Sequence, residues 1–201
     1  LTYAEVDYET LWDEEVHLSK LDKYDWLHLH HEDFTGQYGK FYRNYHNAPW
    51  YIEQKTQFEN LARKYGMPSV HEEKKAVSRA IKNYISNGGF LFAMCSATDS
   101  YDIALSLENI DGVHSVFDGT PIDDDILNKI DYSKSLVFKD FKIYTDPMIY
   151  EFSDIDYPPS HNPVTRGAEA DYFSLFEFSA KYDPVPTMLT QNHVPIVKGF
   201  M

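Results

Sequence analysis

The 201-residue chain has a single cysteine, Cys95, which excludes an internal disulfide. This leaves the cellular compartment open, cytoplasmic or exported, because exported bacterial proteins often lack disulfides too. Long hydrophobic runs are also missing. The longest, residues 90–95, is far shorter than the roughly 20 residues that a membrane-spanning helix needs. We therefore expect no membrane span in this segment.

Basic residues are few: 18 Lys and Arg stand against 32 Asp and Glu, which gives a formal net charge of -14. Such a surface repels phosphate backbones, so we expect no nucleic-acid partner. Hydrophobic residues make up 43% of the chain, including 16 Tyr and 13 Phe, which is typical of a folded domain.

The start of the chain, Leu1-Thr2-Tyr3-Ala4, contains no Met and no signal peptide. We interpret residues 1–201 as a single domain that is an internal piece of a longer protein. A parallel sheet cut at both ends leaves unpaired strand edges. The piece alone is therefore expected to be poorly stable and to self-associate.

The first half reads as strands and helices in α/β order. Strands are predicted at residues 6–11, 24–30 and 90–95, and helices at 52–65, 70–86 and 99–107, with Ser69 as N-cap and Glu72 as its capping-box partner. The continuously apolar strand at 90–95 is expected to be buried on both faces of a parallel sheet. In the second half, strands are predicted at 135–144, 149–152, 172–178, 186–190 and 194–200. These add β structure to the sheet.

Cys95 is the leading candidate for catalysis, because it lies where an apolar strand gives way to a helix. Its neighbours at minus two and plus two are Ala93 and Ala97. Small residues at these positions are what a nucleophile elbow requires, since the sharp turn leaves no room for larger ones. The following helix N-terminus favours the thiolate. A buried cysteine that only packs is the alternative.

The segment Asn87-Gly88-Gly89-Phe90-Leu91-Phe92-Ala93-Met94-Cys95-Ser96-Ala97 resembles the Gly-Gly, strand and cysteine elbow of class I glutamine amidotransferase-like domains. Residues 24–29 resemble the earlier strand that leads to the oxyanion-hole loop of that fold. Residues 26–38, 90–105 and 183–192 are more closely similar to a group of bacterial proteins that carry the name asparagine synthetase B. The resemblance implies a flavodoxin-like three-layer sandwich with a parallel central sheet, in a longer and exported protein.

The sequence departs from those enzymes at three places. The elbow reads Ala-Met-Cys-Ser-Ala instead of Gly-x-Cys-x-Gly, and the loop after the second predicted strand holds His30-His31-Glu32-Asp33 instead of glycines. None of the later histidines belongs to a His-x-Glu, so a base of that type would have to lie outside this segment. Asparagine synthesis is not expected, because residues 96–100 lack the glycines of a pyrophosphate loop.

The second candidate is the cluster of His28, His30, His31, Glu32 and Asp33. His28 and His30 share one face of a strand, and Leu27 and Leu29 share the other. We predict that this cluster holds no tight metal, because its acids lack a matching spacing. A metal-dependent hydrolase that uses His28, His30 and Asp33 is kept as an alternative.

Parallel strands bring His30, His31 and Cys95 to the same sheet edge, where open α/β sheets bind ligands. We therefore predict a catalytic group of Cys95, His30 and His31. Substrate-binding candidates near it are Glu32, Tyr38, Arg43, Ser96 and Asp99.

The leading hypothesis is cysteine-dependent hydrolysis or transfer of an amide or ester, with no cofactor. The competing hypothesis is a non-catalytic domain that binds a small molecule, a peptide or a carbohydrate through the Tyr-rich loop.

Overall fold

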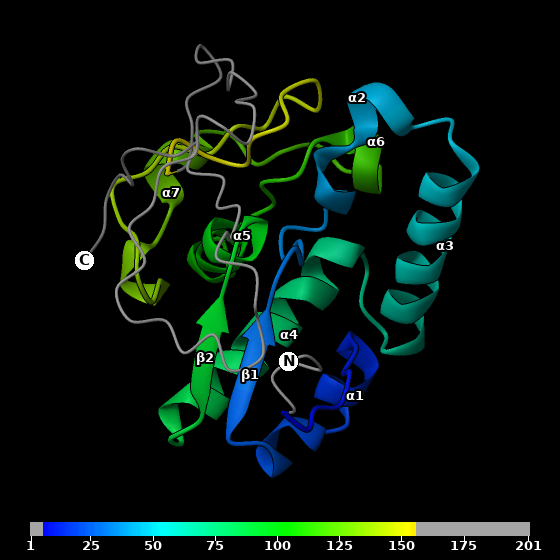
Figure 1. The fold of residues 1–201 in the computed structure, drawn as a ribbon. Coiled ribbons are helices and arrows are strands. Elements are labelled where there is room, and N and C mark those ends of the chain that lie inside the picture. Colours follow the sequence, from blue (N-terminus) through cyan, green and yellow to red (C-terminus); the bar gives the residue numbers. More distant parts are fainter. Residues whose placement is uncertain (1–5, 156–201) are drawn as a thin grey trace, which may run out of the picture.

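The computed structural model describes residues 6–155, in which helices pack behind and beside a small parallel sheet (Figure 1). The strands predicted at 172–178, 186–190 and 194–200 lie outside the described residues. The helices are α1 (Asp13–His17), α2 (Tyr42–Tyr45), α3 (Pro49–Lys64), α4 (Val70–Ser86), α5 (Ser96–Ser106), α6 (Ser115–Asp118) and α7 (Ile126–Lys129). Short 3-10 turns occur at Lys20–Lys23, Tyr38–Lys40 and Tyr132–Lys134.

The sheet consists of β1 (Trp26–Leu29) and β2 (Phe90–Ala93), which pair in parallel with Leu29 opposite Ala93. The parallel pairing of these two strands confirms the prediction. The strand predicted at residues 6–11 is wrong, because this segment has no regular structure and leads directly into α1. Three consecutive acids in the first turn favour that helix through its dipole.

Helix α4 forms where its sequence signals predicted it. The Ser69 side chain accepts a hydrogen bond from the Glu72 backbone N–H at 3.3 Å, which satisfies one free donor of the first turn. Its apolar stripe, which includes Val77 and Ile81, is buried against the sheet and α5. The predicted N-cap and the predicted extent of this helix are confirmed.

The turn from α4 to β2 explains the two adjacent glycines. Gly88 has a φ of 102°, a left-handed conformation that side chains disfavour. A Cβ on Gly89 would lie 2.2 Å from the Tyr84 ring. The chain can therefore enter β2 this close to α4 only with glycine at that position.

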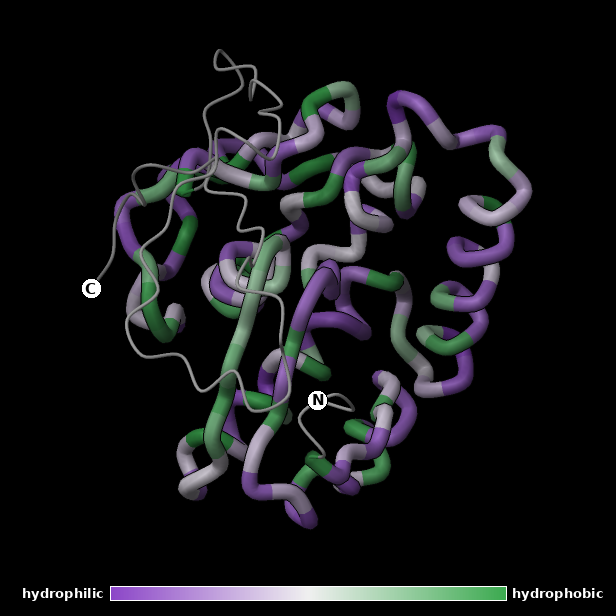
Figure 2. Tube along the Cα trace, viewed as in Figure 1, coloured by the Kyte–Doolittle hydropathy of each residue, from purple (hydrophilic) through white to green (hydrophobic). Residues whose placement is uncertain are grey.

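One face of the sheet packs on the core, and the other is exposed. Leu29 is buried, and Leu91 packs against the same cluster under α4 and α5. Phe90 and Phe92 point to the opposite face, and they are 60% and 43% exposed. The expectation that residues 90–95 are buried on both faces is therefore wrong. Figure 2 shows the hydrophobic run along β2 and the hydrophilic residues that follow β1.

The segment after α7 packs on α5 through individual apolar side chains such as Phe138 and Phe141. Its N–H groups at Leu136, Val137 and Phe138 donate to the buried Asp102 carboxylate at 2.7–2.8 Å. A single antiparallel bridge joins Ile143 and Ser153. The strands predicted at residues 135–144 and 149–152 are therefore wrong. The described residues there hold only isolated bridge positions, and the Asp102 side chain on α5 accepts the N–H groups at the start of the segment.

The described residues form a mixed α/β structure. Within the described range, no helix is both long enough and apolar enough to cross a membrane. This agrees with the short hydrophobic runs of the sequence.

Candidate functional site

Cys95 lies at a sharp turn between β2 and α5. Its φ is 55° and its ψ is -137°, a combination that residues with a side chain rarely adopt. The preceding Met94 N–H donates to the Leu29 carbonyl at 3.0 Å, so the ladder holds the chain up to this point. The side chain of Cys95 is exposed. A nucleophile elbow is predicted here from the sequence, and the positive φ at the cysteine agrees with such a sharp turn.

Helix α5 begins immediately after the cysteine, three residues earlier than predicted. The Cys95 carbonyl accepts hydrogen bonds from the Thr98 N–H at 3.0 Å and the Thr98 hydroxyl at 2.6 Å. Ala97 is completely buried beneath the turn, so a larger side chain would not fit there. The N–H groups of Ala97 and Thr98, in the first turn of α5, thus bond to the Met94 and Cys95 carbonyls and close the turn around the cysteine.

The loop after β1 is organised by Asp33. One carboxylate oxygen accepts from the N–H and hydroxyl of Thr35, and the other accepts from the N–H groups of Gln37 and Gly39. These four bonds, between 2.6 and 2.9 Å, occupy both oxygens. Asp33 therefore shapes the loop. Among the described residues, it does not join His28 and His30 in a cluster that could hold a metal.

The same loop is attached to α5 by Ser100, which is fully buried. The Ser100 hydroxyl donates to the Glu32 carbonyl at 3.0 Å and accepts from the Phe34 N–H at 3.4 Å. Because α5 also carries the elbow at its first turn, this contact fixes the loop after β1 relative to Cys95. This role of Ser100 could not be predicted from the sequence, because nothing in its local pattern indicates a contact with a segment so distant in the chain.

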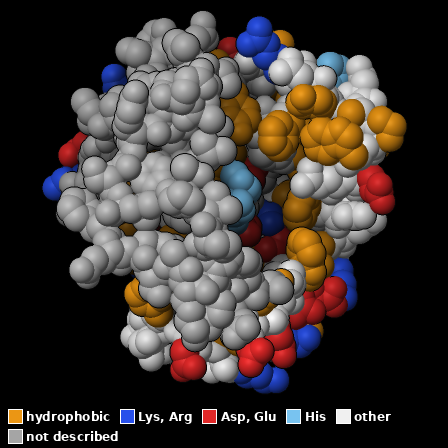
Figure 3. Space-filling view, in the orientation of Figure 1, with side chains coloured by type: hydrophobic (Ala, Val, Ile, Leu, Met, Phe, Trp, Pro, Cys, Tyr) orange, Lys and Arg blue, Asp and Glu red, His pale blue; other side chains and the backbone are white. Residues whose placement is uncertain are grey.

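Exposed histidines occupy the edge next to the elbow. His30 and His31 directly follow β1, and their rings lie 3.9 Å apart between centroids. His28 points to the exposed sheet face, where its ring packs edge-on against Phe92 at 5.2 Å. Figure 3 shows histidine side chains near the middle of this face, beside a hollow. The parallel register thus places His30 and Cys95 at the carboxyl ends of adjacent strands, as expected.

The candidate substrate-binding residues separate into two groups. Glu32 and Arg43 are exposed, and Ser96 is half-buried as the first residue of α5. Tyr38 and Asp99 are buried.

Tyr38 packs in the core between α3 and α6, where burial raises the pKa of its hydroxyl. Asp99 accepts a hydrogen bond from the Ser153 hydroxyl at 3.3 Å. These two side chains hold the fold together instead of facing a ligand, because their segments turn them inward.

A buried lysine holds the far end of the loop. Lys40 is 1% exposed, and its ammonium donates to the carbonyls of Tyr144 and Glu151 at 2.8 and 2.7 Å. Burial lowers the pKa of Lys40 to about 8. The burial of Lys40 could not be predicted from the sequence either, because lysine side chains are normally exposed.

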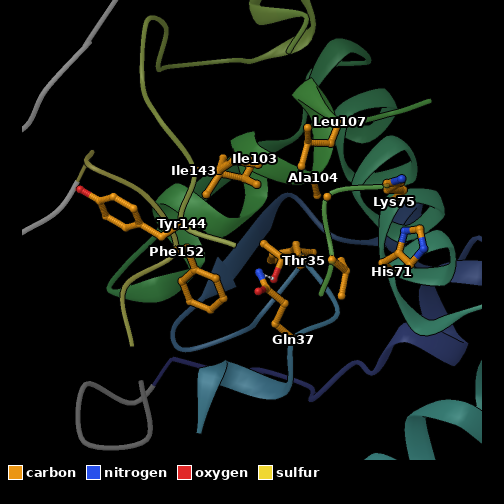
Figure 4. A pocket seen from close by; sticks show the side chains of 13 residues that line it. Thr35, Gln37, His71, Lys75, Ile103, Ala104, Leu107, Ile143, Tyr144 and Phe152 are labelled. Carbon is orange, nitrogen blue, oxygen red and sulfur yellow. Dashed lines mark hydrogen bonds between the residues drawn. The ribbon is translucent and has the colours of Figure 1, made fainter. Parts of the chain in front are cut away.

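Behind the loop lies a small cavity between α4 and α5 (Figure 4). Its volume is about 20 Å³, which is room for one water molecule but not for a substrate. Thr35 and Gln37 line it and are joined by a 3.0 Å hydrogen bond. Cys95 does not line this cavity, and its side chain is exposed elsewhere on the surface.

Comparison of the chain with protein-family models, curated proteins and solved structures returns no match. The resemblance to class I glutamine amidotransferase-like domains stays a prediction, and the function has to be argued from the site itself.

The backbone at Cys95 leads to a stability prediction. Cys95→Gly is expected to be more stable than Cys95→Ala by about 1 kcal/mol, since both variants lose the sulfur but only glycine relieves the positive φ. Urea unfolding of the two variants measures this difference directly. An alanine variant of equal or higher stability would show that the turn is not strained.

Proposed function

We propose that this chain is a cysteine-dependent acyl-transfer domain of the class I glutamine amidotransferase-like type, in which Cys95 attacks an amide or ester carbonyl. The observation that carries the proposal is the backbone of Cys95, a residue other than glycine with a φ of 55° between a parallel strand and a helix. Strain of this kind costs about 1–3 kcal/mol, and it is concentrated at active sites. The exposure of the thiol supports the same function.

In the proposed reaction, the Cys95 thiolate adds to the carbonyl carbon and the carbonyl oxygen takes the negative charge. Loss of the leaving amine or alcohol, which accepts a proton, then forms a thioester on Cys95. Water or an acceptor amine cleaves the thioester and restores the thiol. In this proposal the N–H of Ser96, the residue after the nucleophile, donates to the oxyanion, and the N-terminus of α5 favours the negative charge.

The proposed base is a histidine at the same edge. His30 and His31 follow β1 directly and are exposed. Within the described range, the histidine that follows Cys95 in the chain is His114. It caps α6, where its Nδ1 accepts the Val116 N–H at 3.2 Å, so it has a structural role. The resemblance implies that the usual base lies elsewhere in a longer protein. Within this segment, His30 and His31 are the proposed proton acceptors.

We also propose that the two-stranded sheet is the centre of a flavodoxin-like three-layer sandwich. The order of β1, α3, α4, β2 and α5 supports this arrangement, as does the packing of α4 and α5 on one face (Figure 1). The exposed opposite face, with Phe90 and Phe92, would carry the third layer.

A second candidate function is binding of a carbohydrate or peptide. The observation that favours it is an exposed aromatic cluster of Phe41, Tyr45, Trp50 and Tyr150, with ring centroids 5.3–6.1 Å apart. Figure 3 shows hydrophobic side chains gathered over α2 and the start of α3. Arg43 lines a neighbouring surface groove of about 360 Å³. Binding at this cluster would not depend on Cys95, so mutation of the cysteine separates the two functions.

Alkylation by iodoacetamide tests the leading function. At neutral pH, the single thiol of the native full chain is expected to react faster than the same thiol in the unfolded chain, because an elbow presents its nucleophile exposed and oriented for attack. Ala93→Leu, which crowds the turn, should reduce that advantage. A native thiol that reacts more slowly than the unfolded one would mean that Cys95 is structural.

A further inference from the structure

A second cluster of groups that could bind a ligand lies at the start of α4. His71, the second residue of α4, faces Asp111 in the connection after α5 and Asp118 at the end of α6. Their potential ligand atoms all lie within 4.8 Å of one another. The His71 Nε2 atom is 3.4 Å from Oδ2 of Asp118 and 3.8 Å from Oδ1 of Asp111.

Two of these groups are buried without a hydrogen-bond partner. Oδ2 of Asp118 accepts no hydrogen bond from any described residue, although its side chain is only 6% exposed. Nδ1 of His71, whose side chain is 7% exposed, likewise forms no hydrogen bond within the described range. A buried carboxylate oxygen without a donor is costly, so the arrangement calls for a cation between these groups.

The protein holds both carboxylates in place through their other contacts. Asp111 accepts from the Val113 N–H at 3.0 Å and the Thr120 hydroxyl at 2.7 Å. The remaining oxygen of Asp118 accepts from the Thr120 N–H at 3.0 Å. Fixed outer contacts of this kind orient metal ligands and raise metal affinity.

The geometry points to a site for one divalent transition-metal ion, best suited to Zn²⁺, held by His71, Asp111 and Asp118. Two ligands bound about 2.1 Å from a tetrahedral Zn²⁺ lie about 3.4 Å apart, close to the two separations measured from His71. An imidazole with two carboxylates suits zinc or its neighbours better than Mg²⁺ or Ca²⁺, which prefer oxygen ligands. Water would complete the coordination.

The local charge matches a divalent cation. Asp111 and Asp118 contribute two negative charges. The nearest lysine, Lys75, is already paired with Glu72 at 2.7 Å and donates to the Ile110 carbonyl at 2.8 Å, so its charge is balanced. The ion would join the start of α4 to the connection between α5 and α6.

Zinc titration of the full chain, first dialysed against a chelator, tests this site. We expect one Zn²⁺ per chain by calorimetry and a higher melting temperature, with little response to Mg²⁺ or Ca²⁺. Asp118→Asn should weaken Zn²⁺ binding at least tenfold. The matched exposed substitution Asp124→Asn and the β1-edge substitution His30→Asn should leave binding unchanged.

Without zinc, Asp118→Asn is expected to be at least as stable as the wild type, because it removes a buried charge without a donor. The proposal is wrong if the wild type does not bind zinc. It is also wrong if Asp118→Asn binds zinc as tightly as the wild type, or if His30→Asn loses zinc binding. If Asp118→Asn does not fold, X-ray absorption of the zinc-loaded wild type decides. One imidazole with oxygen ligands supports the site, whereas sulfur or several imidazoles contradict it.

Discussion

Replacing Asp102 by alanine is expected to lower the free energy of unfolding by about 3 kcal/mol or more. Its carboxylate accepts three backbone N–H groups, from Leu136, Val137 and Phe138, and the residue is 1% exposed. Removing the acceptor takes a hydrogen bond from each of these donors, and each buried polar group left unsatisfied costs about 1–3 kcal/mol.

Chemical denaturation of Asp102→Ala beside the exposed control Asp124→Ala measures the effect. The control is expected to change stability by no more than about 0.5 kcal/mol. Asp102→Asn keeps one acceptor oxygen and should be intermediate. An alanine variant as stable as the control would show that Asp102 does not anchor the segment after α7.

The second large effect concerns catalysis. With p-nitrophenyl acetate as a model ester, the wild type is expected to release a burst of about one equivalent of p-nitrophenolate as the thioester forms. Cys95→Ala should reduce the acylation rate by about 10³-fold, since no other group can replace the nucleophile. His30→Ala or His31→Ala should cost about 10²-fold if that histidine is the base.

The exposed histidine His46, at the end of α2, provides a matched control. His46→Ala should leave the burst unchanged, because this residue lies in another part of the surface. Equal bursts in the wild type and Cys95→Ala would remove Cys95 from the reaction.

Local sequence patterns predicted local structure well. The Ser69 cap and the elbow at Cys95 each depend on neighbouring residues, so each could be predicted from spacing alone. The parallel pairing of β1 and β2 followed from the α/β order, which restricts the possible topologies.

Features that depend on distant contacts could not be predicted. From the sequence alone, Lys40 and Asp102 are expected to be exposed charged residues. In the structure both are buried, and their hydrogen-bond partners lie in segments far along the chain. The residues after α7 were predicted as strands because apolar side chains that pack one at a time into a core give the same mixture of apolar and polar residues as a β-strand. His71, Asp111 and Asp118 are far apart in the sequence and match no known spacing of metal ligands, so the sequence did not indicate a metal site there.

The most direct test of the central claim, that Cys95 is a nucleophile, is to trap the acyl-enzyme. The full chain is treated briefly with p-nitrophenyl acetate, quenched in acid and examined by peptide mass spectrometry. Our account predicts one acetyl group on Cys95 in the native wild type, and much less in native Ala93→Leu and in the unfolded chain. Acetylation confined to lysines or histidines, or equal labelling of Cys95 in the native and unfolded chains, would contradict it.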